Sequence, residues 1–62
     1  MDKELLMLYG ARYAVIKVLD SGGKWFSKTV ENDKQLVEYA DICNYLTKMI
    51  DKYKAESEDV ND

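Results

Sequence analysis

The residue types on which most enzyme chemistry depends are nearly absent from this sequence. It contains no histidine, so the commonest general base and metal ligand is missing. Cys43 is the single cysteine, and without an imidazole to activate it a small apolar role suits it better than that of a nucleophile. Gly22 and Gly23 are not followed by the Lys-Ser/Thr pair of a phosphate-binding loop. The sequence therefore predicts no catalytic site, no metal and no cofactor.

Four residues on the expected outer face of a C-terminal helix are the candidates for binding a protein partner. Two carboxylates three residues apart, Glu38 and Asp41, share one face of a helix, and such a pair is typical of a solvated surface rather than of catalysis. Tyr45 lies off the apolar stripe of that helix, where an aromatic side chain indicates a second contact surface. The candidate partner-binding residues are Glu38, Asp41, Tyr45 and Asp51.

An alternative site lies in the first half of the chain, where aromatic and basic residues alternate. Trp25 and Phe26 between Lys24 and Lys28 would suit a strand surface that stacks bases and binds phosphate. The competing interpretation is a hairpin with one aromatic side chain in the core and two exposed lysines. Few basic residues beside an acidic helix make a weak electrostatic footprint, so direct binding to nucleic acid remains the alternative. Its candidate contacts are Arg12, Lys17, Lys24, Trp25 and Lys28.

The charge of the chain is unevenly distributed. The net charge is −3, but residues 1–30 carry five basic and three acidic side chains, whereas residues 31–62 carry four basic and nine acidic ones. An acidic half repels nucleic acid and favours a protein partner with a basic surface.

The segment from Asn32 to Ser57 has the clearest periodicity and predicts one long amphipathic helix. Its apolar residues fall on one stripe at about 100° per residue, which suits a helix that covers a core. Asn32 or Asp33 would cap its first turn. The residues expected in this core or in a dimer interface are Leu36, Tyr39, Ile42, Cys43, Leu46, Met49, Ile50 and Tyr53, with Trp25 and Phe26 from the segment before the helix.

Two segments around Ser21–Gly23 predict a β-hairpin. Arg12–Leu19 and Lys24–Val30 are rich in β-branched and aromatic residues, and the apolar positions of the first lie all around a helical wheel. A three-residue loop would pair Val18 with Phe26 and would avoid placing like charges opposite each other.

A short helical turn is expected before this hairpin, over Met1–Tyr9. Asp2 would cap the turn and Gly10 would end it. A strand over Leu5–Tyr9 is the competing prediction.

These elements predict a single small α+β domain over residues 1–57 and a disordered acidic tail over 58–62. A two-stranded ribbon is marginal alone, and a chain of 62 residues buries little surface. We therefore expect a homodimer that shares a sheet or a helix interface. The lone cysteine suits the reducing cytoplasm, and the apolar run Leu5–Leu8 is too short for a secretion signal or a membrane span.

The segment Ala40-Asp41-Ile42-Cys43, together with the total length, resembles the small dimeric RNA-binding helical hairpin that controls plasmid copy number. That family needs an unbroken first helix. Ser21-Gly22-Gly23 interrupts the corresponding region, so the resemblance does not extend beyond these four residues.

As a type, a very short acidic chain without histidine or cofactor motif resembles the small early, host-takeover proteins of bacterial viruses. The resemblance implies a non-enzymatic viral protein that binds one host protein and inhibits or redirects it. Some proteins of this type imitate DNA with an acidic surface. The partner expected for this chain is therefore a host protein with a basic surface, of which DNA-binding proteins are one class.

Overall fold

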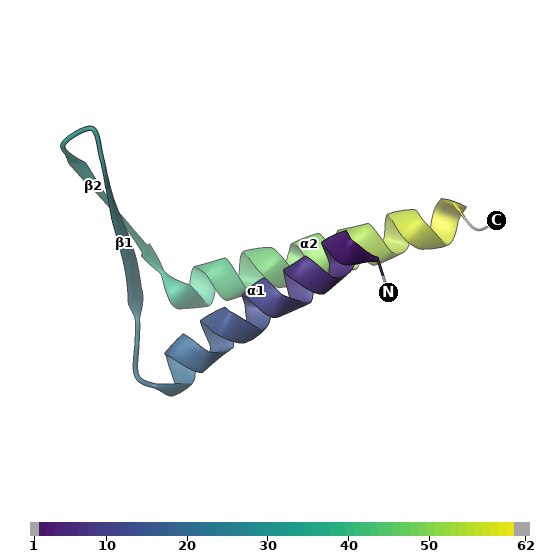
Figure 1. Cartoon of the computed structure of the whole chain (residues 1–62), viewed down its shortest axis with the longest axis horizontal. Helices are drawn as coiled ribbons and strands as arrows, with labels where there is room; N and C mark the ends of the chain where they lie inside the picture. Colours follow the sequence, from purple (N-terminus) through teal and green to yellow (C-terminus); the bar gives the residue numbers. More distant parts are fainter. Residues whose placement is uncertain (1, 61–62) are drawn as a thin grey trace.

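The computed structural model describes residues 2–60, and the side chains of residues 2–57. It has an α+β fold with the element order α1 (Lys3–Asp20), β1 (Trp25–Val30), β2 (Asp33–Glu38) and α2 (Tyr39–Val60). The two helices lie side by side and antiparallel, and the β-hairpin stands out from the end at which α1 stops and α2 starts (Figure 1). The molecule measures 47 × 29 × 17 Å.

Helix α1 is closed at both ends by residues that satisfy its free backbone groups. The Asp2 carboxylate accepts a hydrogen bond of 2.8 Å from the Glu4 amide, as the sequence predicts for a cap. At the other end the Gly23 amide donates to the Val18 carbonyl at 2.9 Å, and the Gly22 amide donates to Leu19 at 3.0 Å. Gly22 has φ +90°, a left-handed conformation that glycine adopts without steric cost. These bonds form a Schellman motif, so the glycine pair ends a helix.

The prediction of a strand over Arg12–Leu19 is wrong, because this segment continues α1, and Gly10 lies within the helix rather than at its end. Half-buried residues of α1 recur at helical spacing and pack towards α2. They are Leu5, Leu8, Tyr9, Arg12, Val15, Val18 and Leu19. The sequence does not reveal this row of half-buried residues as an apolar stripe, for two reasons. Arg12 interrupts it, and apolar side chains also occupy the side of α1 that faces away from α2. They are Leu6, Met7, Tyr13 and Ile16. Packing against α2 therefore overrides the β-propensity of this segment.

The observed hairpin joins β1 and β2. The strand predicted over Lys24–Val30 is confirmed as β1, but its antiparallel partner is β2, with Phe26 opposite Val37 and Val30 opposite Asp33. The pairing predicted between Val18 and Phe26 is therefore wrong. The connecting residues Glu31 and Asn32 have φ of 49° and 73°, the left-handed values that a two-residue type I′ loop requires.

The long helix begins at Tyr39, and the prediction that it starts near Asn32 is wrong. The residues that would have capped and opened it form the loop and β2 instead. At the hairpin's base the Tyr39 amide donates to the Lys24 carbonyl at 2.8 Å, so α2 starts where the ribbon closes. Its assigned end is Val60, three residues beyond the predicted Ser57. Residues 61–62 of the expected acidic tail lie outside the described residues.

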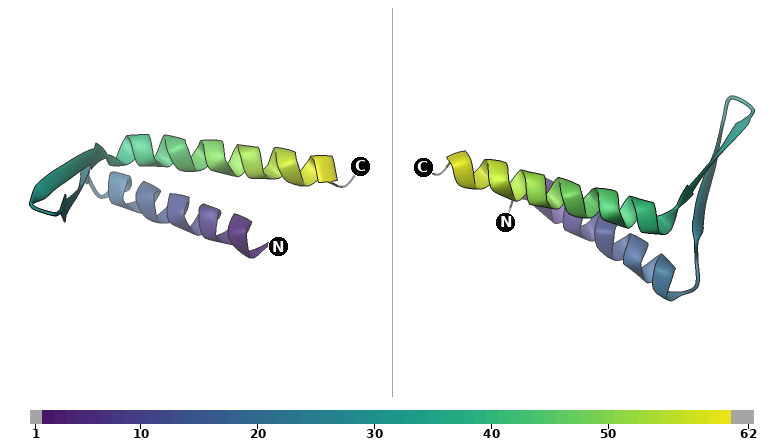
Figure 2. Two further views of the ribbon diagram at one scale, coloured as in Figure 1. Left: turned by 90° about the horizontal axis from the view of Figure 1, so that it is seen from above. Right: turned by 180° about the vertical axis from the view of Figure 1, so that it is seen from behind.

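The core lies between α1 and α2, and it is small. Ile50 is the one fully buried apolar side chain among the described residues, with 2% of its surface exposed. The hairpin does not share in this core, because α2 packs along α1, and the views in Figure 2 show the hairpin projecting from the helix pair. Every strand residue except Glu38 is exposed.

Candidate protein-binding groove

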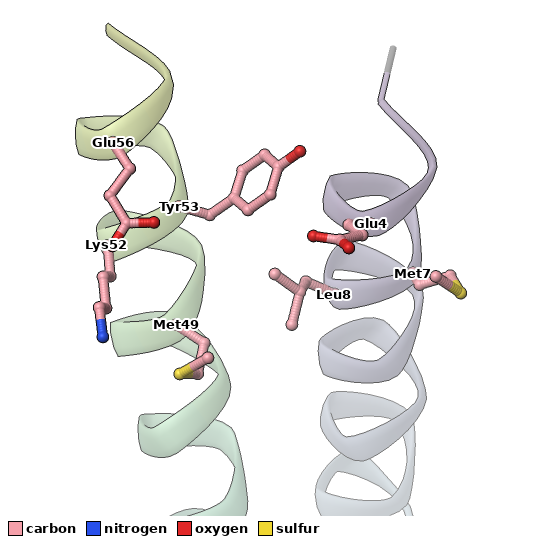
Figure 3. A pocket seen from close by; sticks show the side chains of 7 residues that line it. All are labelled: Glu4, Met7, Leu8, Met49, Lys52, Tyr53 and Glu56. Carbon is pink, nitrogen blue, oxygen red and sulfur yellow. The ribbon is translucent and has the colours of Figure 1, made fainter. Parts of the chain in front are cut away.

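An open groove of about 440 Å³ lies between the start of α1 and the last turns of α2. Leu8 from α1 and Met49 and Tyr53 from α2 point into the space between the helices, and the Glu4 carboxylate lies beside them (Figure 3). This region is the acidic-groove site, and the residues that line it are Glu4, Met7, Leu8, Met49, Lys52, Tyr53 and Glu56.

Helical spacing explains why these side chains meet. Met49, Lys52, Tyr53 and Glu56 stand at i, i+3, i+4 and i+7 of α2, so they share one side of that helix. Because the helices are antiparallel, this end of α2 lies beside the first turns of α1 (Figure 1). The result is an apolar floor of Leu8, Met49 and Tyr53, with the exposed Met7 and the charged side chains at its margin.

Tyr53 links the two helix ends at the groove. Hydrogen bonding from the Tyr53 hydroxyl is the main cause that lowers the pKa of the Asp2 carboxyl, and the Glu4 amide adds to it. The same contact raises the pKa of Tyr53 to about 12. Asp2 therefore caps α1, and its carboxyl also interacts with a side chain of α2 at this end of the groove.

The acidic character of this end is local. Asp2, Glu4 and Glu56 lie here, and Glu58 and Asp59 follow along the chain. The part of α2 from Tyr39 to Ser57, which includes Glu56 and Lys52 of the groove, is balanced, because it carries three carboxylates (Asp41, Asp51, Glu56) and three lysines (Lys48, Lys52, Lys54). The negative charge of the second half of the sequence therefore belongs to the hairpin and to the C-terminal end, and not to the outer face of the helix.

The four predicted partner-binding residues do not form one patch. Asp41 and Tyr45 are exposed one turn apart on α2, and Glu38 ends β2 just before them. Asp51 lies ten residues beyond Asp41, about 15 Å along the helix and about 80° around it. Lys48 stands between them, so this face presents mixed charge.

The predicted core residues divide between the helix pair and the hairpin. Tyr39, Ile42, Cys43, Leu46, Met49 and Tyr53 are half-buried, and Ile50 is buried. Leu36, Trp25 and Phe26 lie on the hairpin and are exposed, outside any core formed by this chain. Phe26 makes one edge contact with Tyr39, at 6.1 Å between ring centroids.

The predicted nucleic-acid contacts are also dispersed. Arg12 turns towards α2, where its guanidinium donates to the Thr47 hydroxyl at 3.4 Å and lies 5.4 Å from the Tyr9 ring. Lys17 lies over Tyr13, and Lys24 lies 5.5 Å from the Trp25 ring. Lys28 is exposed on β1. Three of the four cations thus rest on aromatic rings of their own chain.

Comparison of the chain with protein-family models, with curated proteins and with solved structures gave no match. Within the described part of the chain, no group of His, Cys, Asp or Glu side chains is arranged to hold a metal ion. No helix among residues 2–60 has the length and hydropathy needed to cross a membrane.

Sequence reasoning missed the acidic-groove site because half of it comes from α1. The residues Glu4, Met7 and Leu8 lie in the short turn predicted at the N-terminus, with no sign of what they would face. The available signal was the outward apolar pair Leu6 and Met7, which a buried core does not need.

Proposed function

We propose that the chain is a non-enzymatic protein-binding module, of the type represented by the small acidic early proteins of bacterial viruses. One observation carries the proposal. Ile50 is the single fully buried apolar side chain among the described residues, whereas ten large apolar side chains are 39–65% exposed. A monomer of this size does not need so much apolar surface outside, and such surface is typical of protein interaction sites.

The chemistry of the acidic-groove site suits a partner segment in which an apolar residue stands beside a lysine or arginine. Methionine side chains adapt to differently shaped apolar groups, so Met7 and Met49 suit an inserted side chain. The charged residues of the groove are Glu4, Lys52 and Glu56, so its net charge is −1, and its two carboxylates would pair with a neighbouring cation of the partner. A host protein in the cytoplasm with a basic surface fits this description, and DNA-binding proteins belong to that class.

A selection from a random peptide display library tests this function. Peptides retained by the purified chain should combine an apolar residue with a nearby Lys or Arg, and the double variant Glu4→Lys, Glu56→Lys should bind them at least tenfold more weakly. Asp41→Lys with Asp51→Lys is the matched control, because it makes the same charge change on exposed positions outside the groove. Equal loss in both variants, or enrichment of acidic peptides, would contradict the groove as the binding site.

A gel-retardation assay distinguishes the proposed function from the alternative, in which the chain binds nucleic acid. Binding through Lys24, Trp25 and Lys28 would retard single-stranded DNA or RNA in a low-salt gel and would weaken steeply as salt is added. We expect no retardation, because Arg12 is turned towards Thr47 and the remaining cations lie on an otherwise acidic chain.

A further inference from the structure

We propose that the outer surface of α1 binds a second copy of this chain in an antiparallel arrangement. The surface, called here the outer stripe, consists of Leu6, Tyr9, Tyr13 and Ile16. These residues follow one another at steps of three, four and three, the spacing of a helix–helix seam. Leu6 is 57%, Tyr13 62% and Ile16 39% exposed, so these three side chains face away from α2. Tyr9 is half-buried at the edge of the stripe, where Lys54 of α2 lies over its ring.

The solvent-exposed area of the chain is larger than a compact monomer needs. The accessible surface is 5189 Å² for 7.2 kDa, whereas a typical folded monomer of that mass exposes about 4,100 Å². An interface of standard size buries about 800 Å² per partner. The excess is therefore comparable to what one such interface removes.

Gly10 lies in the middle of this surface and has no role inside the chain. A Cβ at Gly10 would meet no atom within 4 Å, so internal packing does not require a glycine there. Glycine weakens a helix interior, and a common reason to keep it is the close approach of another backbone. A hollow of about 410 Å³ at this place is lined by Tyr9, Gly10, Arg12, Tyr13 and Ile16, which leaves room for side chains of another helix.

The outer stripe can pair with the same stripe of a second copy that runs in the opposite direction, because its residues are spaced symmetrically. Leu6 and Ile16 stand equally far from Ala11 on either side, and so do Tyr9 and Tyr13. A two-fold axis that crosses the stripe at the level of Ala11 along α1 would therefore place Leu6 opposite the partner's Ile16 and Tyr9 opposite the partner's Tyr13. This matching of like with like identifies a second copy as the occupant.

Charge also favours the antiparallel orientation. The side chains of Asp2, Lys3 and Glu4 give the start of α1 a net charge of −1, whereas those of Lys17, Asp20 and Lys24 give its other end +1. An antiparallel pair brings each acidic start beside the basic end of its partner, while a parallel pair would place like charges together. The stripe does not share residues with the acidic groove, because Met7 and Tyr13 lie about 120° apart around α1.

Sedimentation equilibrium of the full chain across the micromolar range tests the proposal. The wild-type chain should show twice the 7.2 kDa of the protomer, and Tyr13→Lys should weaken the dimer at least tenfold. Tyr45→Lys is the matched control, because Tyr45 is an equally exposed helical tyrosine, at 61%, outside the stripe. A monomeric wild-type chain, or equal effects of the two variants, would overturn the proposal.

Two further measurements keep the test independent of folding defects and fix the orientation. Circular dichroism should show an unchanged helix content in Tyr13→Lys. If that variant unfolds, Gly10→Leu takes its place in the test and should weaken the dimer, since the monomer has space for a side chain at this position. In a Cys43→Ala background, oxidation should join a Leu6→Cys chain to an Ile16→Cys chain. Faster joining of two Leu6→Cys chains would overturn the antiparallel arrangement.

Discussion

The contact between Asp2 and Tyr53 makes two residues at opposite ends of the chain depend on each other. Asp2 caps α1, and its interaction with the Tyr53 hydroxyl near the end of α2 lowers the pKa of Asp2 and raises that of Tyr53. Asp2 is exposed and Tyr53 is only half-buried, so solvent screens the electrostatic part of their interaction.

This pair predicts a dependence on pH at both extremes. The pKa of Tyr53 is raised from 10.0 to about 12, so its contribution to folding is complete below pH 10 and is lost as the pH rises through about 12. The pKa of Asp2 is lowered from 3.8, so its contribution is present above 3.8 and is lost as the pH falls through the lowered pKa.

A spectrophotometric titration of tyrosinate measures the alkaline part of this prediction. Of the five tyrosines, one should ionise late, near pH 12, and Tyr53→Phe should remove that late step. Tyr45→Phe is the control and should leave the late step in place. If Asp2→Asn leaves the late ionisation unchanged, the carboxylate is not its cause.

A second prediction at the scale of single residues concerns the end of α1. Gly22→Ala should lower the free energy of unfolding by about 1–2 kcal/mol, because an alanine pays that cost in the left-handed conformation. Gly22→Asn is the control and should cost less, since asparagine tolerates this conformation. Urea unfolding followed by circular dichroism measures both. Equal stability of all three chains would contradict the Schellman motif.

At the scale of the elements, the sequence predicts β1, the cap at Asp2 and the class of fold, but not which segments form the hairpin. Ser21–Gly23 suits both a hairpin loop and a helix end, and the choice depends on whether the preceding segment packs against α2. The Asn32 region has the same ambiguity, because Asn caps helices and also adopts the left-handed conformation of a type I′ loop. Local propensity therefore allows both assignments at each place, and the packing of α1 against α2 decides the first of them.

Substitutions at Glu31 test directly whether Glu31 and Asn32 form a hairpin loop. Glu31 has φ 49°, so Glu31→Gly should remove a steric cost of about 1 kcal/mol, and Glu31→Val should increase it. Hydrogen exchange of the β2 amides should slow in the first variant and quicken in the second. If a helix began at Asn32 instead, position 31 would precede that helix. Glu31→Gly would then not slow the hydrogen exchange of these amides, and Glu31→Val would not quicken it.

At the scale of the whole molecule, the structure is extended for its length. The radius of gyration is 14.4 Å, whereas a compact domain of 62 residues has about 10.6 Å. The projecting hairpin and the narrow helix pair account for the difference (Figures 1 and 2). A chain of this shape keeps much of its apolar surface for contacts with other molecules.

The candidate site could be predicted from the sequence only as a type of interaction. The scarcity of catalytic residue types led to the expectation of a protein-binding chain, which is the function proposed here. The place of that site could not be predicted, because it depends on the antiparallel meeting of Glu4 and Met7 with Met49 and Glu56. Residues some fifty positions apart meet there, and no local pattern encodes their contact.

The most direct test of the proposed function is a methyl NMR titration with a selected peptide that carries an apolar residue beside a lysine. The Met7 and Met49 methyl signals should shift as the peptide binds, and the Trp25 indole signal on the hairpin should stay in place. Glu4→Lys with Glu56→Lys should abolish these shifts. A shift of the Trp25 indole without any change at Met7 or Met49 would show that the hairpin, and not the acidic groove, is the binding surface.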